Sequence, residues 1–455
     1  MSSRTTVPSR SMKAQTVAAL VVVLAGIATV ADAGHQFFRN GSVGGVSIDT
    51  EGVLRNYDPE GRKLLLDELK KDVADADGEL NIPTGMRKIS LKGLEAAIVD
   101  AVQNNLGVLP EEVRFLAGLQ RIQYILVDEK NNDVIIAGPG EGWRVDENAH
   151  VVGVTTGRPV MMLDDLLVAF REVHAARQGG ISCSIEPTAE GVKRLNALLA
   201  KQTSVNRRTL EPRMKEAFGP QQIKVSGVPT TSHFARILVA ADYRMKRLAM
   251  GLDKSPVDGL PSYVEMVKKA NVKQNPRWWL ACNYQPIAKS EDGLAWEIRG
   301  PGVKCMTENQ FYDANGKAQV TKSVDRIAQL WAKRFTEKYE ALVVEDAAFG
   351  YLRNLMDMCV AAALIEKEHL MDLAGCQTPV ITGHENGVVI RTWNAPKTVE
   401  PQCSFLRTRK GWVVTASGGV QIESWQIAEQ SEVVSRLSRV RAEATESGRG
   451  TWWWN

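Results

Sequence analysis

The stretch from Leu109 to Pro187 constrains the fold most, because its hydrophobic period changes several times. Residues 119–127 (LQRIQYILV) alternate in the manner of a half-buried strand, and residues 134–136 resume the strand after a polar turn. This pattern predicts a β-hairpin. Residues 163–170 then place leucine or phenylalanine at helical spacing and predict a helix with one buried face. Helices and antiparallel hairpins that follow one another in this way predict an α+β fold with a mixed central core.

Two polar features of the same stretch have both a functional and a structural interpretation. Asp164 and Asp165 lie in the predicted first turn of that helix. Carboxylates there favour the positive end of the helix dipole, although a catalytic role for the pair stays open. Glycines at 138, 140 and 142 suggest a phosphate loop, but the spacing is not GxGxxG and no Lys-Ser or Lys-Thr pair follows. We interpret this segment as a tight turn that ends the hairpin.

Several motifs carry a family resemblance, namely LAGLQRIQYILVD, VIIAGPGEGW, TGRPVMMLDDLLVAF and ISCSIEPTAEG. They resemble a family of exported bacterial proteins, common in planctomycetes, that is described only as a domain of unknown function. ARILVAADYRMKRLAMGL near 235–252 and KTVEPQCSFLRTRKGWVVTASGGVQIESW near 397–425 are similar to the same family. The resemblance spans roughly residues 40–430. It implies export and the extent of the globular part, and it assigns no catalytic residue.

The first 33 residues read as a signal peptide. Arg4, Arg10 and Lys13 form a basic region, an apolar run covers residues 17–30, and Ala31-Asp32-Ala33 has the A-x-A form of a cleavage site. The run has 14 residues, fewer than the ~20 that a spanning helix needs. We therefore expect cleavage after Ala33 and a periplasmic or extracellular protein. No other stretch reads as long and apolar enough to span a membrane, so we expect no transmembrane segment after cleavage.

Composition and charge are those of an ordinary globular protein. Hydrophobic residues make up 44% of the chain and charged residues 24%, and 455 residues allow two or three domains. The leader accounts for two of the three net positive charges, so the remainder is close to neutral. Because a nucleic-acid partner requires a strongly basic face, we expect no nucleic acid to bind.

Changes in periodicity predict the domain boundaries. After the signal peptide (1–33), residues 34–85 hold a hairpin and a charged helix, and residues 86–375 form the α+β core. Residues 376–425 switch to short strands between glycine and asparagine turns, which predicts a small, separate β-module. Residues 426–455 predict a charged helix with a tryptophan-rich tail.

Two surfaces are expected to face solvent. The predicted helix 233–250 has an apolar side and a charged side, and we interpret the charged side as a solvated face, although it could bind an anionic polymer. Its charged residues are Arg236, Asp242, Arg244, Lys246 and Arg247. Trp452, Trp453 and Trp454 follow a glycine joint, and we expect them to be exposed and available for a contact.

The cysteines suggest structure rather than metal chemistry. None forms a CxxC pair, which excludes metal-ribbon and thioredoxin motifs, and six cysteines allow fifteen pairings. Export permits disulfides. Cys376 and Cys403 flank the first strands of the predicted β-module, and we predict a bond between them. The six are Cys183, Cys282, Cys305, Cys359, Cys376 and Cys403.

Catalytic motifs are not recognisable, and the six histidines are scattered, so the sequence predicts neither a metal nor a cofactor. A Cys183 nucleophile with His174 or His233 is conceivable, because catalytic groups meet in space rather than in sequence. Two classes of function remain open. The first is a non-catalytic binding or structural component of the cell envelope or extracellular space, which the lack of motifs favours. The second is an exported hydrolase whose site is assembled from isolated residues such as Cys183 and His174, or Asp164 and Asp165 with a histidine.

Overall fold

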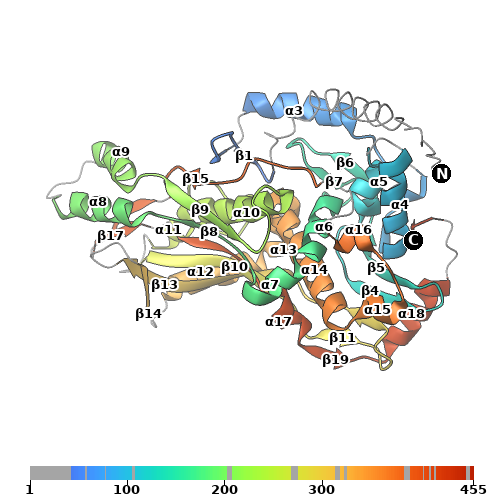
Figure 1. Ribbon diagram of the computed structural model, residues 1–455. Coiled ribbons are helices and arrows are strands. Elements are labelled where there is room, and N and C mark those ends of the chain that lie inside the picture. The colour runs from blue at the N-terminus through green and yellow to red at the C-terminus, as the bar shows by residue number, and fades with distance from the viewer. Residues whose placement is uncertain are drawn as a thin grey trace, which may run out of the picture. The chain divides into compact units, whose positions relative to one another are not determined.

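The computed structural model describes residues 43–56, 59–76, 78–104, 108–201, 207–267, 275–312, 318–321, 325–383, 390–402, 404–408, 411–414, 417–446 and 451–455. These residues lie in a unit that begins at Ser42. They combine helices with mixed and antiparallel sheets, so the predicted α+β class is confirmed (Figure 1). The predicted signal peptide lies outside the described residues.

Within the described residues, the larger sheet has nine strands in the order β1-β2-β15-β9-β8-β18-β10-β13-β14. Most neighbours are antiparallel, and the pairs β2–β15 and β10–β18 are parallel. The sheet therefore joins segments from both ends of the described chain. Its strands are β1 (Val46–Ile48), β2 (Val53–Asn56), β15 (Thr398–Val399), β9 (Gln221–Ser226), β8 (Ile181–Glu186), β18 (Gly418–Ile422), β10 (Asn275–Asn283), β13 (Gly302–Tyr312) and β14 (Ala318–Thr321).

The second large sheet has seven described strands in the order β19-β11-β12-β4-β5-β3-β20. Its β4–β5 pair is the predicted hairpin, and Asn132 in the turn has a φ of 53°, a conformation that asparagine tolerates. The strands are β19 (Ser431–Val433), β11 (Ile287–Lys289), β12 (Ala295–Glu297), β4 (Tyr124–Asp128), β5 (Asp133–Gly140), β3 (Thr84–Ser90) and β20 (Trp453–Trp454). Two small hairpins complete the strands, β6 (Trp143–Val145) with β7 (Val151–Gly153), and β16 (Phe405–Thr408) with β17 (Gly411–Val414).

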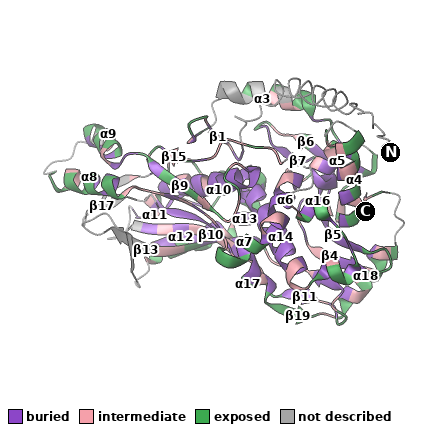
Figure 2. Ribbon diagram, in the orientation of Figure 1, coloured by how far each residue is buried: buried purple, intermediate pink, exposed green. Residues whose placement is uncertain are grey.

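Helices pack against both sheets, and α14 lies at the centre of the core. Its residues from Ala347 to Ile365 are all buried, and it contacts α6, α10, α17 and β13 (Figure 2). The helices are α3 (Pro59–Asp72), α4 (Leu91–Asn104), α5 (Glu111–Arg114), α6 (Leu163–Arg171), α7 (Val173–Gly179), α8 (Ala189–Ala200), α9 (Arg207–Phe218), α10 (His233–Met250), α11 (Tyr263–Val267), α12 (Arg326–Glu337), α13 (Tyr339–Glu345), α14 (Ala347–Lys367), α15 (Leu370–Ala374), α16 (Pro379–Thr382), α17 (Ser424–Ala428) and α18 (Arg436–Glu446), with 3-10 turns η1 (Gly78–Asn81) and η2 (Leu116–Gly118).

Helix α14 also changes one expectation about membranes. From the sequence we expected no stretch after the leader to be long and apolar enough to cross a bilayer. Among the described helices, α14 does have that length and apolar composition. Its entire apolar window is buried inside the protein, as in the core helix of a folded domain.

Helix α10 has the predicted bounds but not the predicted solvated face. Ser232 caps it by accepting a hydrogen bond from the Ala235 amide. Arg236, Asp242 and Lys246 are all buried, and Lys246 Nζ lies 3.0 Å from Asp242 Oδ2. Because the helix packs between the nine-stranded sheet and α14, its charged residues pair inside the protein instead of facing solvent.

The expected separate β-module over 376–425 differs from the structure. Short strands do form, but β15 pairs with β2 and β9, and β18 pairs with β8 and β10. Only the β16–β17 hairpin stands apart among the described strands of this segment. A lone two-stranded ribbon is marginally stable, and strands β15 and β18 gain more burial inside the larger sheet.

The expectation of exposed tail tryptophans is wrong for Trp453 and Trp454, which are 8% and 7% exposed, and Trp452 is half-buried. Strand β20 pairs antiparallel with β3 and closes that edge of the seven-stranded sheet. The Trp454 indole nitrogen donates to the Ala444 carbonyl at 3.3 Å. An uncovered sheet edge exposes backbone groups and apolar side chains, so the tail is better buried there than in water.

The predicted Cys376–Cys403 bond cannot be followed to its second residue, because Cys403 lies outside the described residues. Cys376 is a buried free thiol. Burial raises its pKa to about 11, against a backbone hydrogen bond from Val134 of β5 that lowers it. Beside position 403, the Gln402 backbone amide donates a hydrogen bond to Gln221 Oε1 in β9 at 2.6 Å, which holds this part of the backbone at a different strand. The pairing stays a prediction without support from these contacts.

Candidate functional site

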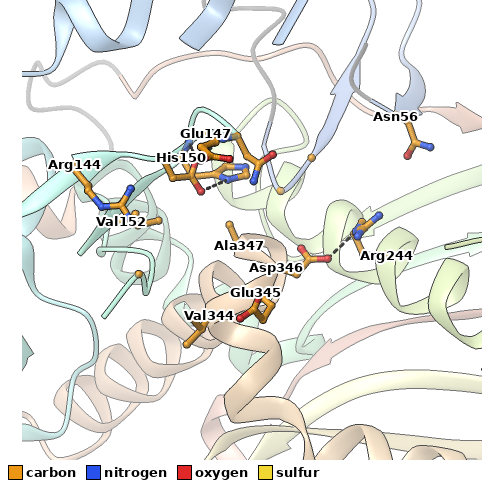
Figure 3. Close-up of a pocket in the computed structure, with 15 residues that line it drawn as sticks. Asn56, Arg144, Glu147, His150, Val152, Arg244, Val344, Glu345, Asp346 and Ala347 are labelled. Atoms are coloured by element: carbon orange, nitrogen blue, oxygen red, sulfur yellow. Dashed lines mark hydrogen bonds and ion pairs between the residues drawn. The ribbon is translucent and has the colours of Figure 1, made fainter. Parts of the chain in front are cut away.

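A polar cavity of about 620 Å³ lies where the β6–β7 hairpin, the β1–β2 hairpin, α10 and the α13–α14 junction meet (Figure 3). Four segments far apart in sequence supply its walls. Its lining is Gly44, Gly45, Asn56, Arg144, Asp146, Glu147, Asn148, His150, Val152, Gly157, Arg244, Val344, Glu345, Asp346 and Ala347. The volume falls within the range of small-molecule sites in proteins, so the cavity is the candidate site.

Asp146 and His150 form a rigid pair in the turn between β6 and β7. Asp146 Oδ1 accepts hydrogen bonds from the amides of Asn148 and His150, both at 2.8 Å. His150 Nδ1 lies 3.3 Å from Asp146 Oδ2. Burial acts to raise the pKa of Asp146, but the hydrogen bond and charge of His150 outweigh burial and lower it. Ala149 takes a φ of 64°, and this left-handed conformation lets the turn close on Asp146.

The second nitrogen of His150 is the unusual feature of this pair. His150 is 6% exposed, and its Nε2 is buried without a hydrogen-bond partner in the described part of the chain. Because an ionised carboxylate only accepts hydrogen bonds, Nδ1 carries a hydrogen, and Nε2 is an acceptor whenever the ring is in its neutral form. A residue of the cavity lining therefore carries an enclosed nitrogen that the described part of the fold leaves unused.

Arg244 forms the opposite wall and is fully engaged by carboxylates. Its Nε donates to Asp346 Oδ2 at 2.8 Å, and its Nη1 donates to Asp253 Oδ2 at 2.6 Å. Asp346 also caps α14 by accepting from the Ala348 amide. Burial acts to lower the pKa of Arg244, but the two carboxylates outweigh it and raise the pKa. These contacts fix the break between α13, which ends at Glu345, and α14, which begins at Ala347.

Three charged residues of the lining are left outside ion pairs in the described part of the chain. Glu147 and Glu345 are exposed carboxylates, and Arg144 is an exposed guanidinium. Figure 3 shows Arg144 on the side of the cavity away from Arg244, with Glu345 below His150 in that view. Including the paired groups, four carboxylates face two guanidinium groups, so the lining is acidic at neutral pH.

A second Asp–His pair lies on the other side of the Tyr351 ring. His233 Nδ1 is 2.9 Å from Asp165 Oδ2, and both side chains are buried. The Tyr351 ring meets His150 and His233 edge-on, with centroid distances of 6.0 and 5.9 Å. Asp165, one of the predicted candidates, therefore does meet a histidine. Neither member of this pair lines the cavity.

The other predicted candidates are not brought together. Cys183 is 2% exposed in the middle of the nine-stranded sheet, paired with Val225 and Val420, and burial raises its pKa well above the ordinary value. Since the thiolate is the nucleophile, this thiol is in an inert setting. His174 is exposed and lies 3.5 Å from Glu366.

Asp164 is half-buried in the first turn of α6, as the helix-dipole interpretation expects. Burial raises its pKa, and the charge of Asp165 adds to the rise, whereas His233 and Arg391 oppose it. The residue is next to the Asp165–His233 pair but does not line the cavity. In the described residues, no group of three or more His, Cys, Asp or Glu side chains is arranged to hold a metal ion.

The sequence contains a local signal for His150, because Asp146 precedes it by four residues in a loop rich in turn-forming residues. The other residues of the cavity lining have no local sequence signal, because residues near 44, 244 and 345 meet only through tertiary structure.

Comparison with known proteins leaves the activity undefined. A family model described as "Protein of unknown function (DUF1598)" matches residues 183–263, the segment from Cys183 in β8 through α10 to Tyr263. No curated protein and no solved structure matches the chain significantly. The match covers one wall of the cavity, through Arg244, and what it shows is a similarity to a domain of unknown function.

Proposed function

We propose that the chain is an exported, non-catalytic protein that binds a small polar ligand in the cavity at His150. The observation that carries the proposal is the cavity itself, whose described lining keeps polar groups outside internal pairs. A fold normally satisfies its buried polar groups, so an unused buried acceptor at a cavity wall is more easily understood as a ligand contact.

A thermal-shift screen of small polar compounds tests this proposal with an occluding variant. Val344 lines the cavity and is 42% exposed, so Val344→Trp fills space at the cavity without crowding the core. Val433 is similarly exposed and does not line the cavity, which makes Val433→Trp the matched control. Ligands should raise the Tm of the native protein and of Val433→Trp but not of Val344→Trp. If a ligand raised the Tm of both variants equally, its binding site would not be this cavity.

A hydrolase is the second candidate, and the Asp146–His150 pair favours it. A histidine oriented by a carboxylate can act as a general base. The described lining holds no serine, threonine or cysteine, so water would be the nucleophile. The enclosed Nε2 would first have to become accessible to that water. Hydrolysis of an ester panel that is lost in His150→Gln but kept in His174→Gln would support this candidate over binding alone.

Export is supported by the order of basic, apolar and A-x-A segments in the leader. Intact-mass analysis of protein from the native host should find Gly34 as the first residue. A retained Met1 or residence in the cytoplasm would contradict export without affecting the cavity.

A further inference from the structure

We propose that the cavity at His150 selects ligands that carry a protonated amine. This inference rests on the proposed binding function and adds the chemical class of the ligand. It combines the enclosed acceptor on His150, the unpaired carboxylates of the lining and the neutralised state of Arg244.

The hydrogen-bonding character of the wall is the first step. Asp146 holds a hydrogen on Nδ1 of His150, which leaves Nε2 of the neutral ring as an unpartnered acceptor on a side chain that is 6% exposed. Nε2 is enclosed, so the ring or its cover must shift before a ligand reaches it. A ligand group that donates hydrogen bonds can then satisfy this atom in the neutral ring, whereas a carboxylate or phosphate oxygen cannot. An ammonium group offers three donors and no acceptor.

The charge balance of the lining is the second step. Glu147 and Glu345 have no ion-pair partner among the described residues, and Figure 3 shows them on either side of the space beside His150 and Asp346. Arg244 adds no free positive charge, because it pairs with Asp346 and shares Asp253 with Arg247, so two guanidinium groups meet two carboxylates. Arg144 is the remaining guanidinium, and it is exposed to solvent. The field inside the cavity is therefore negative and attracts cations.

Three compounds of the same length separate charge from shape. We would titrate the mature full chain by calorimetry at pH 7 and low salt with 1,4-diaminobutane, 1,4-butanediol and succinate, which carry positive, neutral and negative ends on a four-carbon frame. The diamine should bind, and the diol and the diacid should bind at least about tenfold more weakly. Raising the salt concentration should weaken diamine binding, because the attraction is electrostatic.

A pair of double variants locates the effect. Glu147→Gln with Glu345→Gln removes the two cavity carboxylates and should lower the diamine affinity about tenfold or more. Glu129→Gln with Glu190→Gln removes two exposed carboxylates that do not line the cavity, and should change the affinity by no more than about twofold. Equal losses in both double variants would mean that overall charge, not this cavity, holds the diamine.

The outcomes also separate this inference from the binding function on which it rests. Binding of succinate or butanediol that matches or exceeds diamine binding and disappears in Val344→Trp would overturn amine selection and keep the cavity as a binding site. Absence of diamine binding up to millimolar concentration would likewise overturn amine selection. The binding function itself falls only if no compound in the wider screen depends on Val344.

Discussion

Arg87 and His150 are both almost fully buried, yet their hydrogen-bonding groups are used very differently. The Arg87 guanidinium donates to the carbonyls of Leu80, Ala117 and Ile82 at 2.6–3.0 Å, and its Nε donates to Asn455 at 2.9 Å. His150 uses one nitrogen and leaves the other unpartnered at a cavity wall. The contacts of Arg87, called here the Arg87 centre, connect η1, η2, β3 and the tail strand β20. The unpartnered nitrogen of His150 connects no elements of the described structure. The contrast is therefore between a buried cation whose donors complete the fold and a buried ring that lines the cavity and keeps one nitrogen unpartnered.

The largest predicted effect is at the Arg87 centre. Arg87→Met should lower the free energy of unfolding by about 3–5 kcal/mol, because several buried carbonyls lose their donor. Arg144→Met at the cavity rim is the comparison and should change stability by less than about 0.5 kcal/mol. Urea unfolding of both variants measures the difference. Similar losses would erase the distinction between the two centres.

The tail strand gives the next largest effect. Trp453→Ala should cost about 3 kcal/mol, because the ring is buried against β3 and lies 5.3 Å from the Arg87 guanidinium carbon. An exposed tail would instead tolerate this change within about 0.5 kcal/mol. Thermal and urea unfolding of the variant therefore test whether the last strand belongs to the Arg87 centre.

The buried Asp242–Lys246 pair predicts a smaller, pH-dependent effect. Burial raises the pKa of Asp242 to about 6, against the opposing charge of Lys246, whereas the unfolded chain releases this proton near pH 4. The folded state holds the proton more tightly, so the Asp242 contribution to stability is complete below about pH 4 and falls as pH rises to about 6.

The size of that loss is on the order of 2 kcal/mol. Asp242→Asn with Lys246→Met removes both charges, and its stability should lack this component of the pH dependence. Urea unfolding of the native protein and the double variant at pH 4 and pH 6 measures the difference. Parallel pH profiles would show that Asp242 has an ordinary pKa.

The smallest stability effect is expected at the cavity. Glu345→Gln should alter the free energy of unfolding by less than about 0.5 kcal/mol, because the carboxylate is exposed and has no ion-pair partner among the described residues. Urea unfolding tests this, and a loss above about 1 kcal/mol would mean that the cavity charges serve the fold after all.

Elements with local signals were predictable from the sequence. Ser232 and Asp346 are caps that begin α10 and α14, and turn residues at 128–133 fixed the β4–β5 hairpin. The predictions for the charged side of α10 and for the tail tryptophans were wrong. A local pattern places charged residues in solvent and treats a tail that follows a glycine joint as exposed. Only tertiary contacts reveal that Lys246 meets Asp242 under a sheet, or that β3 leaves an edge for β20. The cavity could not be predicted from the sequence, because its walls meet only through tertiary contacts, although the Asp146–His150 spacing is local.

The central claim is that the free nitrogen of His150 belongs to a ligand site, and side-chain nuclear magnetic resonance tests it most directly. Protein labelled with ¹⁵N-histidine would be titrated with 1,4-diaminobutane, and His150→Gln would assign the His150 signals. We predict a saturable shift of His150 Nε2, while the exposed His174 and His369 remain unchanged. A His150 signal that stays fixed at saturating diamine would contradict the claim.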